Sequence, residues 1–80
     1  MSSEEKIKSV MSSVFTIAAS SINSETSKDN VSSWDSHGHM NLILALEESF
    51  GVSIPDEEVP NLTSYPLIKL VMEELASKGN

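Results

Sequence analysis

The residues best suited to chemistry in this sequence are Asp35 and Ser36, which stand side by side just before a run of helix-forming residues, 40–50. Both residue types accept hydrogen bonds from the free amides of a first helical turn. The amino end of a helix also has a positive partial charge, so an anionic group on the Ser36 hydroxyl would meet amide N–H groups and a favourable dipole. On position alone, a serine that only caps the helix is the simpler interpretation.

Other chemistry at this place fits the residues poorly. His37 and His39 are two positions apart, so on a helix they point to different sides, and the chain has no Cys to complete a zinc set. We expect no metal site, an exposed His37 and a partly buried His39. A hydrolase triad is also disfavoured, because Ser36 lacks the glycines of a nucleophile elbow. The sequence therefore predicts no catalytic residue and no enzyme activity.

The helix that follows is predicted to stop at Gly51 and to have two different faces. One face has the spacing of a core stripe and consists of His39, Leu42, Ile43, Leu46 and Phe50. The opposite face is mixed and consists of His37, Met40, Asn41, Leu44, Glu47 and Glu48. A fully solvated face rarely has Met and Leu, so we expect the helix to bury one side and offer the other to a partner.

The residues around this helix resemble those of an acyl carrier protein. The resemblance rests on Asp35-Ser36, on LILALEESF at 42–50 and on IPDEE at 54–58, and it extends from Ile7 onward over nearly the whole chain. In that family the Ser of an Asp-Ser-Leu motif bears a 4′-phosphopantetheine arm derived from coenzyme A. The resemblance therefore implies that Ser36 is the attachment residue and that Asp35 flanks it.

Four positions depart from the family pattern. His37 replaces the usual Leu after the attachment Ser, Ser33-Trp34 replaces Gly-Ala or a similar pair, and Asn41 replaces Glu. These changes leave the expected fold intact and alter the surface that a modifying enzyme would recognise. Trp34 has two interpretations, an aromatic lid that packs the loop onto the helices or a contact for the arm, its cargo or a partner.

The resemblance implies an all-α fold, a four-helix bundle with a long first loop and a short third helix, in one domain over 1–80. It implies a carrier that holds acyl or aminoacyl groups as thioesters on the arm, in fatty acid biosynthesis or in polyketide or secondary metabolism. The implied partners are a phosphopantetheinyl transferase and acyl-activating or acyl-transferring enzymes with basic docking surfaces. The alternatives are an acidic helical interaction module and a degenerate carrier in which His37 prevents modification.

Acidic side chains are concentrated between Asp29 and Ile68, a span that has no Lys or Arg. By default such a charge run is a solvated face. Here the acids neighbour Met40 and Leu44, and an apolar centre with a charged rim is typical of a docking patch. The residues expected to meet partners are Trp34, His37, Met40, Asn41, Leu44, Glu47, Glu48, Asp56, Glu57 and Glu58.

The remaining elements are predicted from the spacing of apolar residues and from the residues that begin or end helices. A first helix, capped by Ser2 or Ser3, is predicted to run to about residue 19, and a polar loop follows over 20–33. We expect a short helical turn over 56–59, limited by the proline after it, and a last helix that Ser64 caps and that ends at Lys78-Gly79.

Size and charge limit the number of domains and the kinds of partner. A chain of 80 residues is long enough for one domain with a thin core. The net charge of −7 argues against nucleic acid and favours basic protein partners. No apolar run approaches the ~20 residues of a membrane span, and no apolar signal segment is present, so we expect a cytoplasmic protein. We also expect it to be a monomer.

Overall fold

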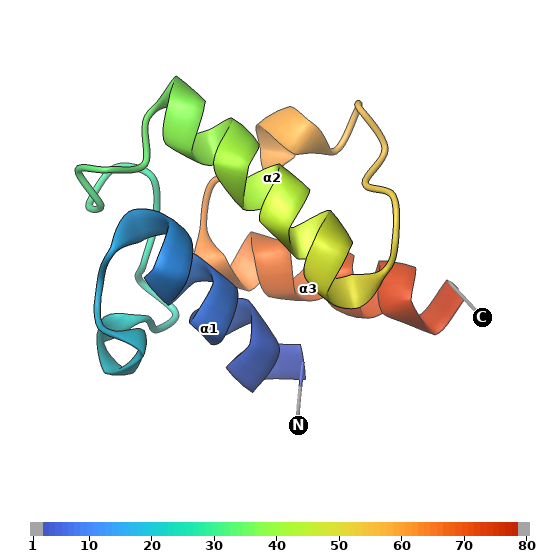
Figure 1. Cartoon of the computed structure of the whole chain (residues 1–80), viewed down its shortest axis with the longest axis horizontal. Helices are drawn as coiled ribbons and strands as arrows, with labels where there is room; N and C mark the ends of the chain where they lie inside the picture. The colour runs from blue at the N-terminus through green and yellow to red at the C-terminus, as the bar shows by residue number, and fades with distance from the viewer. Residues whose placement is uncertain (1–2, 79–80) are drawn as a thin grey trace.

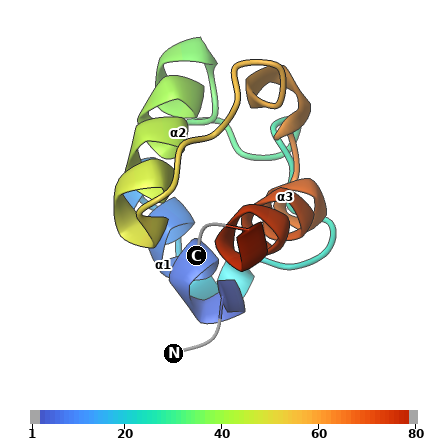
Figure 2. The same ribbon diagram turned by 90° about the vertical axis from the view of Figure 1, so that its right-hand side faces the viewer.

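The computed structural model describes residues 3–78, which form three α-helices and two 3₁₀ turns and contain no β-strand. The elements are α1 (Ser3–Phe15), η1 (Ala19–Ser21), α2 (Ser36–Phe50), η2 (Val59–Asn61) and α3 (Tyr65–Lys78). The view in Figure 2 shows α2 on one side of the molecule and η2 and α3 on the other. The long loop from α1 to α2 passes around one end of the molecule (Figure 1). The expected stop at Gly79 and the alternative cap at Ser2 lie outside the described residues.

The all-α prediction is confirmed, but the expected short third helix is a 3₁₀ turn, so the described residues contain three α-helices in place of four. The amides of Glu58, Val59, Asn61 and Leu62 each bond to the carbonyl three residues earlier. Pro60 has no N–H, so it cannot take part in α-helical hydrogen bonding at this point. A run of such bonds produces a tight 3₁₀ turn, which rarely grows long.

Both α1 and α2 end in the same left-handed motif. The amide of Val52 bonds to the Glu47 carbonyl across Gly51, which has φ 66°. The amide of Ile17 bonds in the same way to Ser12 across Thr16, which has φ 57°. These are the six-to-one bonds of a Schellman motif. The predicted end at Gly51 is confirmed, whereas α1 stops at Phe15, four residues before the predicted end.

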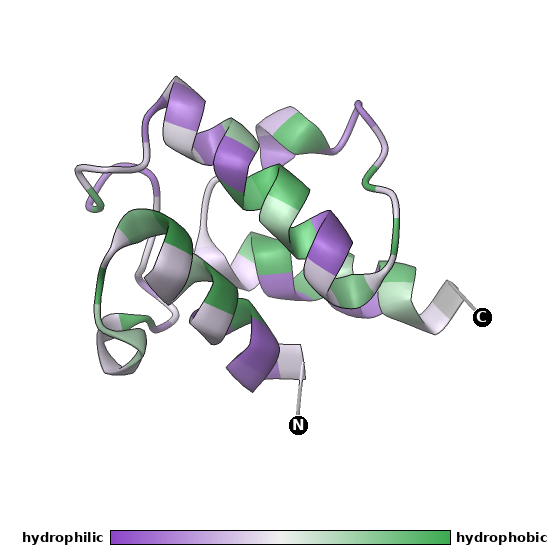
Figure 3. Cartoon of the chain, viewed as in Figure 1, coloured by the Kyte–Doolittle hydropathy of each residue, from purple (hydrophilic) through white to green (hydrophobic). Residues whose placement is uncertain are grey.

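The core lies where the three helices face one another. Its buried apolar side chains are Ile7, Val10, Met11, Phe15, Ile22, Trp34, Leu42, Ile43, Leu46, Ile54, Leu62, Tyr65, Ile68 and Met72. The predicted stripe of α2 is buried except for Phe50, which is half-buried. Figure 3 shows the apolar middle of α2 in green between purple polar segments. Ile22 and the half-buried Val31 contact this core from the long loop, as their apolar character predicted.

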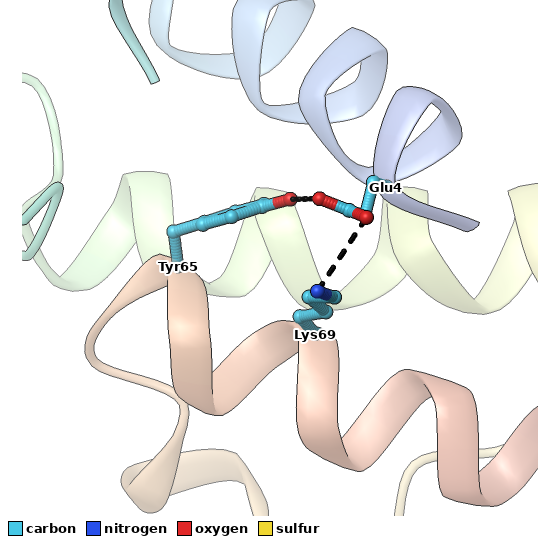
Figure 4. A network of polar contacts seen from close by, with 3 residues as sticks. All are labelled: Glu4, Tyr65 and Lys69. Carbon is cyan, nitrogen blue, oxygen red and sulfur yellow. Dashed lines mark hydrogen bonds and ion pairs between the residues drawn. The ribbon is translucent and has the colours of Figure 1, made fainter. Parts of the chain in front are cut away.

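A polar contact joins the first and last helices at the edge of the core (Figure 4). The Tyr65 hydroxyl donates to Glu4 Oε1 at 3.3 Å, and Lys69 Nζ lies 3.5 Å from Glu4 Oε2. Burial of the ring raises the pKa of Tyr65 above its usual value of 10.0, and the Glu4 carboxylate raises that pKa further. Tyr65 is therefore a neutral donor in the folded protein, even in moderately alkaline solution.

We expect this tyrosine to make the fold sensitive to alkali. The folded state holds the Tyr65 proton more tightly than the unfolded chain does, so this stabilisation is present below about pH 10 and is lost as pH rises through the folded-state pKa. Urea unfolding at about pH 8 and about pH 11 should therefore show a smaller loss of stability in Tyr65→Phe than in the wild type. Equal losses in the two proteins would show that Tyr65 contributes nothing to alkaline unfolding.

Candidate functional site

Asp35 caps the amino end of α2. Its backbone is extended, its Oδ1 accepts from the Gly38 amide at 2.8 Å, and its carbonyl accepts from the His39 amide at 2.8 Å. Ser36 is the first helical residue and its side chain is exposed. The choice between Asp35 and Ser36 as the cap is thus settled in favour of Asp35. The Ser36 hydroxyl is not needed to complete the helix, which removes the simpler interpretation of this residue.

The positive end of α2 remains available beside that hydroxyl. Within residues 3–78, no hydrogen bond engages the Ser36 amide, the His37 amide or the Ser36 hydroxyl. The first amides of a helix lack intrahelical partners, and here two of them adjoin an exposed hydroxyl. This arrangement suits an anionic group attached to Ser36.

Trp34 is buried and does not form part of the exposed surface. It is 2% exposed, and its ring stacks on Phe15 with centroids 4.8 Å apart. Ser33 ties the same loop to α1 by donating its hydroxyl to the Phe15 carbonyl at 2.9 Å. The prediction of Trp34 as a partner contact is therefore corrected. The packing interpretation holds, because a ring enclosed by the end of α1 cannot touch a docked protein.

His39 is more deeply placed than the sequence indicated. It is 8% exposed, whereas the pattern predicted a partly buried residue at the edge of the core. Its ring nitrogens lie 2.9 Å from Trp34 Nε1 and 2.7 Å from the Val59 carbonyl oxygen. The second contact joins η2 to the amino-terminal half of α2. Among the described residues, no group of three His, Cys, Asp or Glu side chains is arranged to hold a metal ion.

Gly38 permits a close approach between the start of α2 and the preceding loop. A Cβ at this position would collide with the Ser33 carbonyl oxygen and would lie 3.3 Å from Asp35 Oδ1. The colliding atom belongs to the backbone, so the clash can be relieved only by moving the loop that leads to Ser36. Gly38 is therefore needed here for space, since its φ is not in the left-handed region.

We expect Gly38→Ala to destabilise the protein by about 1–3 kcal/mol, the usual cost of overpacking. The direction of this change in stability is informative, because Ala is normally favoured over Gly inside a helix by roughly 1 kcal/mol. Chemical denaturation measures the change, and Ser49→Ala, an exposed site on the same helix, should stay within about 0.5 kcal/mol of wild type. A Gly38→Ala variant more stable than wild type would disprove the close approach.

The predicted docking face of α2 is exposed over most of its length. Met40 is 49% exposed and Leu44 is 60% exposed. The other exposed members of the predicted set are His37, Asn41, Glu48, Asp56 and Glu57. Glu47 differs, because it is half-buried and its Oε2 accepts from the Ile54 amide at 2.7 Å. One oxygen of its carboxylate thus holds the chain that follows α2, and its assignment as a docking residue stays a prediction.

Two exposed leucines on α3 were not singled out by the sequence. Leu67 is 41% exposed and Leu70 is 62% exposed. They lie beside a groove of about 500 Å³ between η2 and α3, which Pro60 and Glu58 also line. Glu58 is half-buried there. Their exposure could have been predicted from helical spacing. The buried stripe of α3 contains Ile68 and Met72, and the two leucines lie on another side of the helix.

Comparison with known proteins establishes the fold. No protein-family model matches the chain. The solution structure of a holo acyl carrier protein from Geobacter metallireducens is similar to this chain, with a TM-score of 0.86 and 23% sequence identity. The match covers 99% of this chain and 91% of the other. This protein therefore has the acyl carrier protein fold, as the sequence resemblance implied. No helix within 3–78 has the length and apolar character needed to cross a membrane.

Proposed function

We propose that this protein is a carrier that holds acyl or aminoacyl groups on a 4′-phosphopantetheine arm attached to Ser36 and presents them to partner enzymes. One observation supports the proposal above all others. Ser36 is an exposed first residue of α2 that Asp35 has relieved of capping, in a chain with the acyl carrier protein fold. The protein itself would catalyse nothing.

The residues at the amino end of α2 fit such an arm. The exposed Ser36 hydroxyl is accessible to a phosphate, and the amides of Ser36 and His37 can donate to phosphate oxygens. Asp35 keeps one carboxylate oxygen on the Gly38 amide, so its charge is partly compensated within the cap. When bound, the arm supplies the terminal thiol that this Cys-free chain lacks, and cargo is held there as a thioester.

The partners proposed are a phosphopantetheinyl transferase and acyl-activating or acyl-transferring enzymes. Met40 and Leu44 form an exposed apolar centre on α2, and Glu48 and the turn 56–58 contribute negative charge. A net charge of −7 favours encounters with Lys- and Arg-rich docking surfaces. The absence of Cys suits a reducing compartment, and we place the protein in the cytoplasm as a monomer.

A specialised pathway is our proposal for the cargo, because Trp34 and His37 replace the residues usual around the attachment Ser. The replacement by His37 also supports a second candidate function, that of a protein without an arm. His37 directly follows Ser36 and is exposed, so it lies where a transferase must bind. If His37 blocks that enzyme, the protein is a degenerate carrier or an acidic interaction module without an arm.

Intact mass spectrometry distinguishes the two functions. The protein is incubated with coenzyme A and a broad-specificity phosphopantetheinyl transferase, and its mass is measured before and after. We expect a gain of one phosphopantetheine. An unchanged mass with several different transferases would favour the unmodified module.

A further inference from the structure

A chain of side-chain hydrogen bonds spans the position of Ser36. Trp34 Nε1 lies 2.9 Å from His39 Nδ1, and His39 Nε2 lies 2.7 Å from the Val59 carbonyl oxygen. Trp34 belongs to the loop before Ser36, His39 to the first turns of α2 and Val59 to η2. Trp34 and His39 are 2% and 8% exposed, so water competes little for these bonds. We call this chain the Trp34–His39–Val59 relay.

The relay defines the state of the imidazole. An indole N–H can only donate, so His39 Nδ1 must be the unprotonated acceptor. Nε2 must then have the ring hydrogen, which it donates to the Val59 carbonyl. The ring is therefore neutral and held in one tautomer. The Trp34 indole and the Val59 carbonyl thus occupy both ring nitrogens.

The loop before Ser36 is held from the other side as well. Phe15, the last residue of α1, stacks on the Trp34 ring and accepts the Ser33 hydroxyl at its carbonyl. Ser36 thus lies between one anchor on α1 and another on η2. Removing the relay frees the indole and the η2 carbonyl from α2 while leaving the Asp35 cap in place, because that cap uses different atoms.

We propose that Trp34 and His39 are positioning residues for Ser36, and that their relay to Val59 holds the loop in the one arrangement that a phosphopantetheinyl transferase binds. This inference rests on the proposed function of Ser36. A carrier that populates the binding-competent arrangement only part of the time shows an apparent affinity reduced by that fraction. The relay therefore acts on the KM of the transferase for this protein, and kcat stays near its wild-type value because bound complexes are alike.

The first test detects the hydrogen bonds of the relay directly and needs no phosphopantetheine loading. Nitrogen-15 NMR of His39 should show the neutral Nε2–H tautomer near neutral pH, and the Trp34 indole hydrogen should exchange slowly with solvent. We expect His39→Phe, which keeps a ring but has no acceptor, to speed that exchange at least about tenfold. His39→Gln should largely restore protection, because its amide can accept from Trp34 and donate to Val59. An Nδ1–H tautomer in the wild type would overturn the relay.

The second test measures transferase kinetics with coenzyme A and the apo protein. We expect His39→Phe to raise KM about tenfold with little change in kcat, and His39→Gln to bring KM back towards wild type. Ile68→Val, a core change on α3, controls for a general loss of stability and should leave KM nearly unchanged. If His39→Phe fails to fold, Trp34→Phe removes the indole donor while keeping an aromatic ring against Phe15, and a KM rise of a few-fold is expected.

The outcomes separate this inference from the proposed function. A wild-type protein that no transferase loads defeats the proposed function and the positioning role together. A wild-type protein that loads normally, with His39→Phe loading at the same KM or matching Ile68→Val, defeats the positioning role alone. A fall in kcat at constant KM would also contradict it, because that pattern would place His39 in the chemical step.

Discussion

Ser36→Ala is expected to lose covalent loading completely while the protein stays folded. The hydroxyl oxygen is the proposed site of attachment, and alanine offers no atom to replace it. Folding should be unaffected, since Asp35 and not Ser36 caps α2. Alanine is also a better helix former, so stability should match wild type within about 0.5 kcal/mol. Intact mass after the transferase reaction measures loading, and circular dichroism measures folding.

The matched control for this substitution is Ser32→Ala. Ser32 is exposed and lies in the same loop, four residues before Ser36, so it tests whether any nearby serine can be loaded. This variant should gain one arm like the wild type. The control is needed because the chain has 16 serines. A Ser36→Ala protein that still gains the arm would show that another serine is the attachment site.

The helix that presents Ser36 could be predicted almost completely from the sequence. Asp35 caps it through an amide three residues away, and Gly51 ends it through a left-handed backbone that glycine adopts without strain. Both signals act within a few residues of the helix ends. The buried stripe also follows from spacing alone, which is why Leu42 and Leu46 lie in the core as predicted.

The end of α1 could not be predicted in the same way. It uses the same left-handed motif as α2, but the residue with positive φ is Thr16, whose side chain gives no signal of that conformation. The tertiary structure sets this end. Ser33 bonds to the carbonyl of Phe15, the last residue of α1, and Trp34 covers its ring. Those partners lie about 18 residues further along the chain.

The surroundings of Ser36 were predicted only in part for the same reason. Trp34 had two interpretations because its neighbours, Phe15 and His39, meet only in the folded chain. The His39 partner on η2 is 20 residues away in sequence. Helical spacing placed the imidazole on the inner face, but it gave no sign of the carbonyl that accepts its hydrogen. The contacts that sequence patterns missed around Ser36 are therefore the long-range ones of Trp34 and His39.

Alanine substitutions of two leucines on α2 are expected to have very different effects on stability. Leu46 is completely buried, whereas Leu44 is 60% exposed two positions earlier. Leu46→Ala should cost about 2–5 kcal/mol, from lost apolar burial and the cavity left behind. That is a large part of the roughly 4–12 kcal/mol expected for a domain of this size. Leu44→Ala should change the unfolding free energy by less than about 0.5 kcal/mol. Urea unfolding measures both.

Leu44→Ala, which should hardly change stability, is expected to weaken partner binding. If α2 is the docking face, Leu44→Ala removes an apolar contact at its centre and should weaken transferase binding by about 1–2 kcal/mol, roughly 5- to 30-fold. Leu70→Ala is the matched control, because Leu70 is 62% exposed but lies on α3. Its affinity, measured by calorimetry with the same transferase, should equal that of the wild type. Weaker binding by Leu70→Ala and unchanged binding by Leu44→Ala would move the docking surface from α2 to the groove between η2 and α3.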